Sequence, residues 1–173
     1  MTGLGLALLL GGAFAQQPNR NGNAEEAKAT LANAATADNN GLITKQSRYS
    51  AKETIARFEE AVKAKEANGY MVFPEIDHAA AAKKFGIDML ARTVIVFGNP
   101  QRSTAILIKT PTLAIDVPAK ALVWQDEQGR VWLTYNSAEY LGDTIYPRHG
   151  LPSSPSTPAL AKALVEFSDY ATK

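Results

Sequence analysis

The stretch ALVWQDEQGRVWLTY, residues 121–135, decides the fold of this 173-residue chain. It contains two runs of high β-strand propensity, residues 121–125 and 131–135, on either side of a turn that carries Gly129. Two such runs separated by a short loop with a glycine are typical of an antiparallel hairpin. We therefore expect an antiparallel sheet built around this hairpin.

The run RTVIVF at residues 92–97 precedes the hairpin and predicts a further strand. It is nearly continuous in apolar and β-branched residues, which favours a strand buried on both faces at the centre of the sheet. Residues 70–76 also favour a strand, but Pro74 cannot donate a ladder hydrogen bond and restricts it to an edge or a strand end. The fold requires residues 94–97 and the hairpin to share one sheet.

Helix signals surround these strands. Ser50 and Glu53 form a capping box, and the apolar residues that follow recur at helical spacing as far as Asn68-Gly69. Residues 105–108 are compatible with a helix or with a strand. Further helices are expected at residues 78–85 after Asp77 as N-cap, at residues 137–141, and from Thr157 onward. Helices mixed with strands and an antiparallel hairpin indicate the α+β class.

The first 48 residues predict an export signal and a linker ahead of the domain. The apolar run at residues 4–10 and the exit Ala13-Phe14-Ala15 match a signal peptide cleaved after Ala15, although no basic residue precedes the run. The run is shorter than the roughly 20 residues that cross a bilayer, so we expect no stable membrane span. We assign residues 1–15 to the signal-peptide-like segment, 16–48 to a polar flexible linker and 49–173 to a single domain. The mature protein would then be periplasmic or secreted.

Composition and charge exclude several classes of function. Lysine and arginine number 18 against 17 aspartate and glutamate, a net charge of +1 that offers no field for holding phosphate backbones, so we expect no nucleic-acid partner. The absence of cysteine removes disulfides, thiolate nucleophiles and thiolate metal sites. No Gly-x-Ser-x-Gly elbow and no phosphate-binding glycine loop occur in the sequence.

Short motifs follow one another in order between residues 50 and 151. They are IDHA at 76–79, FGNP at 97–100, DVP at 116–118 with Lys120, VW at 123–124, GxVW at 129–132, YN at 135–136, YL at 140–141 and RHG at 148–150. In these motifs the chain resembles the domain-of-unknown-function 302 family of small bacterial and archaeal proteins. The resemblance implies an α+β fold with a curved antiparallel sheet and flanking helices, similar to the TATA-binding-protein-like fold, and often a homodimer; it implies no activity. Residues 101–105 depart from the family pattern, and residues 142–147 look like an insertion.

The candidate ligand-binding residues are the polar and aromatic side chains inside these motifs: Asp77, His78, Asn99, Asp116, Lys120, Trp124, Arg148 and His149. Two imidazoles and a carboxylate suit a divalent metal such as zinc or copper, on the condition that His78 and His149 converge. A histidine beside an aspartate is alternatively an acid/base pair. Each residue also has a structural interpretation, in which Asp77 caps a helix, Asp116 shapes a turn and the histidines bind backbone carbonyls.

The leading hypothesis is an exported binding or accessory module, homodimeric, that holds a small ligand or an envelope partner protein. Its binding surface would combine the sheet with the loops that carry His78, Asp116 and His149. The first alternative is a metal-assisted or acid/base enzyme that uses His78 and His149. The second alternative is a structural subunit of an envelope or extracellular assembly. The sequence identifies no catalytic residue and indicates no cofactor.

Overall fold

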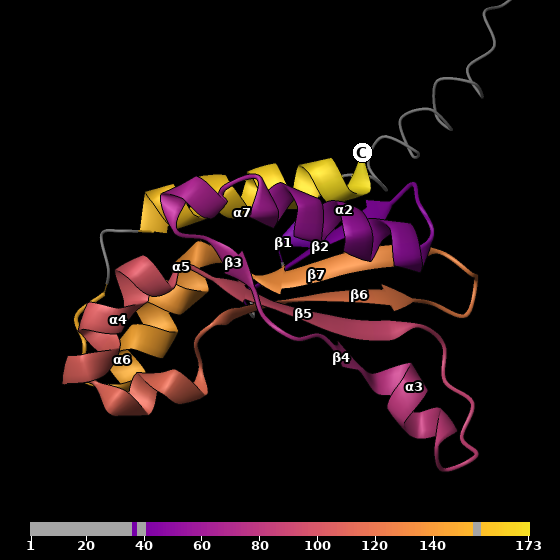
Figure 1. The fold of residues 1–173 in the computed structure, drawn as a ribbon, viewed down its shortest axis with the longest axis horizontal. Helices are drawn as coiled ribbons and strands as arrows, with labels where there is room; N and C mark the ends of the chain where they lie inside the picture. The colour runs from indigo at the N-terminus through magenta and orange to yellow at the C-terminus, as the bar shows by residue number, and fades with distance from the viewer. Residues whose placement is uncertain (1–35, 38–40, 154–156) are drawn as a thin grey trace, which may run out of the picture. The chain divides into compact units, whose positions relative to one another are not determined.

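The sheet is antiparallel throughout and is built on the expected hairpin. The computed structural model describes residues 36–37, 41–153 and 157–173, so the signal-peptide-like segment 1–15 and most of the linker 16–48 lie outside the described residues. The seven described strands are β1 (Thr36–Ala37), β2 (Leu42–Ser47), β3 (Met71–Val72), β4 (Ile76–Asp77), β5 (Arg92–Gly98), β6 (Ala119–Gln125) and β7 (Val131–Asn136). Their order across the sheet is β1-β2-β7-β6-β5-β3, and β4 also pairs with β5 (Figure 1). The α+β class and the shared sheet of β5 with the hairpin are confirmed.

Two predictions about β5 were wrong. The strand lies one position from the sheet edge, because the short strands β3 and β4 pair with its outer side. Its residues alternate between fully buried and half-buried, with Thr93, Ile95 and Phe97 pointing to the covered face. The apolar run is continuous because the opposite face also carries valines, and only one of the two faces is closed by helices.

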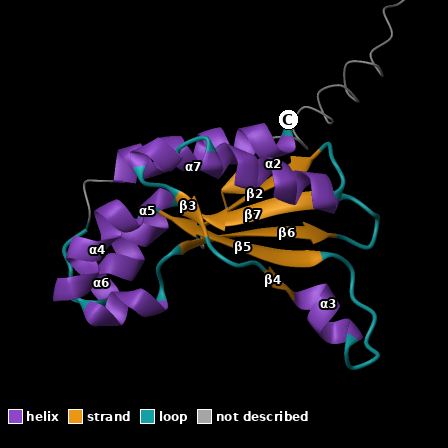
Figure 2. Ribbon diagram, in the orientation of Figure 1, coloured by secondary structure: helices purple, strands orange, loops and turns teal. Residues whose placement is uncertain are grey.

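The helices α2 (Ala51–Lys63) and α7 (Thr157–Thr172) lie side by side on one face of the sheet (Figure 2). Helix α2 begins as predicted, because the Ser50 hydroxyl accepts a hydrogen bond from the Glu53 amide at 3.2 Å. Edge-to-face contacts join the two helices to β5: the Phe58 ring centroid lies 5.1 Å from that of Phe97 and 6.1 Å from that of Phe167. These rings are the centre of the main core.

A second group of helices gathers at the end of the sheet where β5 finishes and β6 begins (Figure 1). It comprises α4 (Pro100–Lys109), η2 (Pro111–Ile115), α5 (Ala138–Tyr140), the π-helix η3 (Leu141–Ile145) and α6 (Tyr146–Arg148). Residues 105–108 are therefore helical. Leu113, Leu141 and Ile145 form a separate small core inside this group. Most of the apparent insertion at residues 142–147 is accommodated by the π-helical turn, the usual form of an extra residue within a helix.

The remaining elements form the outer edge of the sheet. The predicted strand at residues 70–76 is interrupted at Pro74 and appears as the two short strands β3 and β4. Between α2 and β3 lies the single turn η1 (Glu66–Asn68), and after β4 comes α3 (His78–Lys83). Helix α3 has no buried residue. In the described part of the chain no helix is long and apolar enough to cross a membrane.

Strand β2 differs from the sequence prediction, which placed all of residues 16–48 in the linker. It pairs with β7 along its whole length, so the folded part begins before residue 49. Its buried residues are Lys45 and Ser47, each only 8% exposed. The Lys45 ammonium donates to Ser168 Oγ and to Asp169 Oδ1 of α7, each at 2.6 Å. A strand whose buried residues are a lysine and a serine does not show the apolar pattern that sequence reading relies on.

We expect replacement of Lys45 by Met to lower the free energy of unfolding by about 1 kcal/mol, because the hydrogen bonds of its ammonium to Ser168 and to the partly exposed Asp169 are lost. Lys63→Met is the matched control: Lys63 pairs with Glu59 at 2.9 Å on the exposed side of α2, and its loss should change the free energy by less than about 0.5 kcal/mol. Urea denaturation at pH 7 measures both. Equal effects of the two substitutions would contradict this role of Lys45.

The same pair gives the fold a pH dependence. Burial alone would raise the pKa of Asp169, but hydrogen bonds from Lys45 and Lys173 outweigh it and hold the pKa below the ordinary 3.8. A depressed pKa stabilises the folded chain above the ordinary value, and this stabilisation is lost as the pH falls through the folded pKa. The stability difference between wild type and Lys45→Met should therefore shrink below about pH 4.

Candidate functional site

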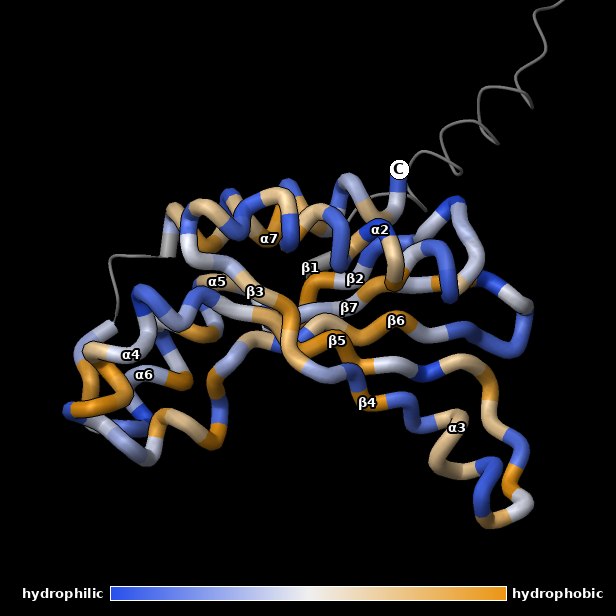
Figure 3. The backbone as a smooth tube through the Cα atoms, viewed as in Figure 1, coloured by the Kyte–Doolittle hydropathy of each residue, from blue (hydrophilic) through white to orange (hydrophobic). Residues whose placement is uncertain are grey.

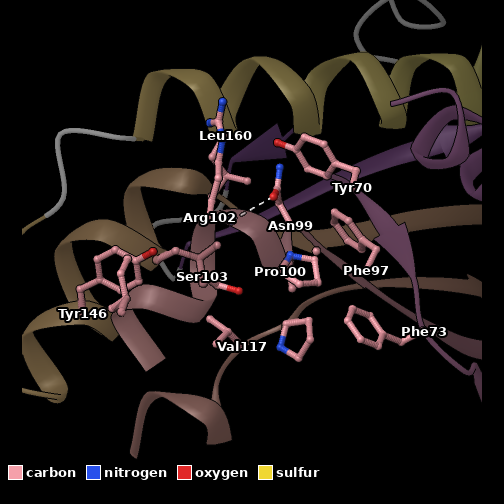
Figure 4. A pocket seen from close by; sticks show the side chains of 15 residues that line it. Tyr70, Phe73, Phe97, Asn99, Pro100, Arg102, Ser103, Val117, Tyr146 and Leu160 are labelled. Carbon is pink, nitrogen blue, oxygen red and sulfur yellow. Dashed lines mark hydrogen bonds between the residues drawn. The ribbon is translucent and has the colours of Figure 1, made fainter. Parts of the chain in front are cut away.

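A cavity of about 280 Å³ lies where the end of β5 meets the helices α4 and α6 (Figure 4). Most of its wall is apolar. The residues that line it are Tyr70, Phe73, Phe97, Gly98, Asn99, Pro100, Arg102, Ser103, Ile106, Val117, Pro118, Ala119, Leu141, Tyr146 and Leu160. Five separate segments of the chain thus build one site, with the rings of Tyr70, Phe73 and Phe97 on the sheet side and that of Tyr146 on the helical side.

The turn after β5 positions the cavity wall. Gly98 is needed for close packing, since a Cβ atom there would lie 3.2 Å from the Pro118 Cβ. Asn99 follows and caps α4: its Oδ1 accepts from the Arg102 amide at 3.1 Å, and its Nδ2 donates to the Asn68 carbonyl at 2.8 Å. Asn99 therefore lines the cavity, as a candidate ligand-binding residue would, but its amide group is already occupied by the backbone.

Four polar side chains of the lining are free to bind a ligand. Within the described part of the chain, the side chains of Tyr70, Arg102, Ser103 and Tyr146 make no hydrogen bond or ion pair with other residues. Burial raises the pKa of the Tyr70 phenol, and the positive charge of Arg102 acts in the opposite direction. In Figure 4 the Ser103 hydroxyl points into the space between the labelled side chains. These groups are available to a ligand.

Four of the eight candidate residues gather beside the cavity around Asp116. The Asp116 Oδ2 lies 2.7 Å from His149 Nε2 and 3.3 Å from Arg148 Nη1. The other ring nitrogen of His149, Nδ1, lies 3.0 Å from the Thr112 hydroxyl, and the side chain is only 6% exposed. Lys120 donates to the carbonyls of Asp116 and Pro118, each at 3.2 Å. The cluster joins η2, α6 and the start of β6, and none of its four members lines the cavity.

Asp77 and His78 lie far from the Asp116 cluster, at the start of α3. The Asp77 carboxylate accepts from the Ala80 amide at 2.9 Å and so caps α3, which is the structural interpretation of this residue. His78 is exposed on α3, and Figure 1 shows α3 and α6 at opposite ends of the sheet. His78 and His149 do not converge, so the condition for a shared metal site is not met. Over the described ranges, no three His, Cys, Asp or Glu side chains are placed to hold a metal ion.

Trp124 lies on the sheet face that α2 and α7 leave uncovered. Its ring stacks on that of Trp132, directly opposite on β7, with centroids 6.0 Å apart and an interplanar angle of 22°. The two indole N–H groups donate to Thr134 at 2.9 Å and to Asp126 at 2.8 Å. Trp124 is therefore separate from both the cavity and the Asp116 cluster.

Sequence reasoning missed the polar groups of the cavity. No recognisable motif contains Tyr70, Arg102, Ser103 or Tyr146. The one sequence feature that could have pointed to three of them is a departure from the family pattern. Arg102 and Ser103 belong to the segment 101–105 that departs from the family pattern, and Tyr146 belongs to the apparent insertion 142–147. Both departures contribute side chains to the cavity wall.

Comparison with known families and structures gives a consistent result. The family model for "Domain of unknown function DUF302" matches residues 43–167. A solved neighbour is the crystal structure of an uncharacterized conserved DUF302 protein from Bacillus stearothermophilus, with a TM-score of 0.60, 20% identity, and coverage of 76% of this chain and 98% of that chain. At this identity the likeness concerns the fold.

Two curated relatives carry a functional name. The chain is 40% identical over 133 residues to "Fluoride-specific ion channel FluC 1" of Brucella suis biovar 1, which covers 77% of this chain and 49% of that protein. The match to "Fluoride-specific ion channel FluC 1" of Brucella abortus biovar 1 has the same identity and covers 46% of that protein. The chain thus spans about half the length of the curated relatives it matches.

We expect the two histidines to respond differently to the same substitution. His149→Asn removes the contacts with Asp116 and Thr112 and should lower the free energy of unfolding by about 2 kcal/mol. His78→Asn changes an exposed side chain and should have an effect below about 0.5 kcal/mol. Thermal or urea denaturation at pH 7 measures both variants. A His149 variant as stable as wild type would show that the Asp116 cluster does not hold the helices around it.

Proposed function

The chain belongs to the domain of unknown function DUF302 family, and we propose that this member is a binding module that holds a small, largely apolar ligand in the cavity beside α4. The observation that carries the proposal is the cavity itself. Its volume of about 280 Å³ is just below the range of pockets that enclose drug-sized ligands. Apolar walls with a few polar groups that lack a protein partner are the usual composition of such sites.

Binding is favoured over catalysis by the way the titratable groups are used. His149 has both ring nitrogens within hydrogen-bond distance of protein groups, and Asp116 is shared between His149 and Arg148. Lys120 donates to backbone carbonyls. An acid/base catalyst has to reach a proton of its substrate, and none of these groups lines the cavity. The Asp116 cluster fits a role in fixing the helices that form the cavity wall.

An accessory role beside a membrane protein is supported by the curated relatives. Those proteins are named as fluoride-specific ion channels, and the region similar to this chain is about half of each. We associate ligand binding with the region that these relatives share with this chain, because it contains most of the residues that line the cavity. In this proposal, the module acts in the envelope together with a membrane partner and responds to its small ligand.

A second copy of the chain is the partner that the surface supports best. The segment after α3 exposes Phe85 by 82% and Ile87 by 57%, with Met89 and Leu90 beside them, and Figure 3 shows its apolar character. The uncovered sheet face carries Trp124 and its apolar neighbours. Exposed apolar patches of this kind mark interaction surfaces. In a symmetric dimer each copy would supply both patches to the other.

The ligand proposal is tested with N-phenyl-1-naphthylamine, a neutral apolar dye whose fluorescence rises in apolar sites. We expect saturable binding to the wild type. Ser103→Phe directs a ring into the cavity and should weaken binding about tenfold or more, an effect that denotes loss of the site. Ala105→Phe places the same ring on an exposed position of α4 and should bind as the wild type does. No binding by the wild type, or unchanged binding by a folded Ser103→Phe variant, would contradict the proposal.

Export and dimerisation are tested together by native mass spectrometry of the full chain recovered from the envelope fraction. The expected species has twice the mass of a chain that begins at Gln16. Phe85→Ser should shift it to the monomer, because the most exposed apolar side chain of the patch is lost. Ile108→Ser alters a 77% exposed side chain on α4 and is the control that should stay dimeric. An uncleaved chain refutes export, and a monomeric wild type refutes the dimer.

A further inference from the structure

Two polar side chains of the cavity, Tyr70 and Arg102, lie toward one end, and the hydroxyls of Ser103 and Tyr146 lie away from it. In Figure 4 the Tyr70 phenol and the Arg102 side chain both extend toward α7, while the rings of Phe73 and Phe97 belong to the sheet side of the wall. Arg102 is exposed, so this end of the cavity meets solvent. Away from Arg102, the part of the wall formed by Val117, Pro118 and the rings of Phe73 and Phe97 is apolar. The cavity therefore distinguishes the two ends of whatever occupies it.

The charge at the polar end is positive. Three charged groups act on the Tyr70 phenol: Arg102, Lys65 and Glu166. Glu166 is already paired with Lys65, whose ammonium lies 2.9 Å from its carboxylate. Over the residues that the structure describes, no carboxylate pairs with Arg102. One uncompensated guanidinium thus remains beside an apolar cavity.

We infer that the ligand is a small amphipathic monoanion, with an apolar body in the cavity and an anionic group that Arg102 binds. The inference rests on the proposed function and names the class of ligand for that site. A guanidinium presents a planar fork of N–H donors that matches a carboxylate or a similar oxyanion. The Ser103 hydroxyl, which has no protein partner, is one residue further along α4 and adds a donor on the cavity side.

Charge complementarity sets this ligand apart from the other candidates. A cationic amphiphile whose head group lay at this end of the cavity would meet the charge of Arg102 and would be repelled. A neutral amphiphile would gain the same apolar contacts but nothing from the guanidinium. Two amphiphiles with the same alkyl chain, one with an anionic and one with a neutral head group, therefore differ in affinity by the contribution of Arg102.

Decanoate and decanol provide that comparison, because they share one alkyl chain and differ in head group. Each would be titrated against the complex of the full chain with N-phenyl-1-naphthylamine. We expect decanoate to displace the dye from the wild type at a concentration about fivefold lower than decanol, the effect of one partly exposed ion pair. Arg102→Gln should abolish this preference while it leaves displacement by decanol unchanged.

Lys109→Gln is the matched control, since it removes one positive charge from the far end of the same helix. It should keep the preference for decanoate. Equal displacement by decanoate and decanol in the wild type, or a preference that survives Arg102→Gln, would overturn the inference and leave the proposed function standing. A wild-type chain that does not bind the dye would instead overturn the proposed function.

Discussion

The edge-to-face packing of Phe58, Phe97 and Phe167 is the contact on which the rest of the domain depends. It brings together one residue each from α2, β5 and α7, so it fixes both covering helices on the sheet. Phe97 is also the last large core residue of β5, and its outer side belongs to the cavity wall. The Phe97 ring therefore belongs to both the core and the cavity wall. Strand β5 ends one residue after it, and Asn99 then caps α4.

Helices cover only one face of the sheet, so each strand has one buried face and one face open to solvent. On the covered face, burial selects Ile95, Val123 and Leu133, and Lys45 is tolerated there only because Ser168 and Asp169 meet its ammonium. On the other face the indole N–H groups of the tryptophan pair are satisfied within the hairpin itself. Specific hydrogen bonds thus accompany the polar groups named on both faces of the sheet, whereas the Tyr70 phenol at the cavity makes none with the described residues.

Local signals in the sequence predicted local structure well. Turn chemistry identified the hairpin, and the side chains of Ser50 and Asp77 cap the helices they were expected to begin. Strand β2 was missed because its buried residues are polar, Lys45 and Ser47, and the partners of Lys45 lie 123 and 124 residues away. Of the eight candidate residues only Asn99 lines the cavity, Asp116, Lys120, Arg148 and His149 meet in a cluster beside it, and Asp77, His78 and Trp124 lie elsewhere. The cavity was not predictable, because five segments build it and no spacing rule relates them.

The π-helical turn η3 has a consequence for how members of this family diverge. One added residue in an α-helix rotates everything after it by about 100°, since a turn holds 3.6 residues. A wider turn can absorb such an addition locally, and Tyr146, which follows η3 directly, lines the cavity. An insertion absorbed at η3 would therefore alter the cavity wall at a position separate from the contact of Phe58 with Phe167, so ligand preference could change there independently of the fold.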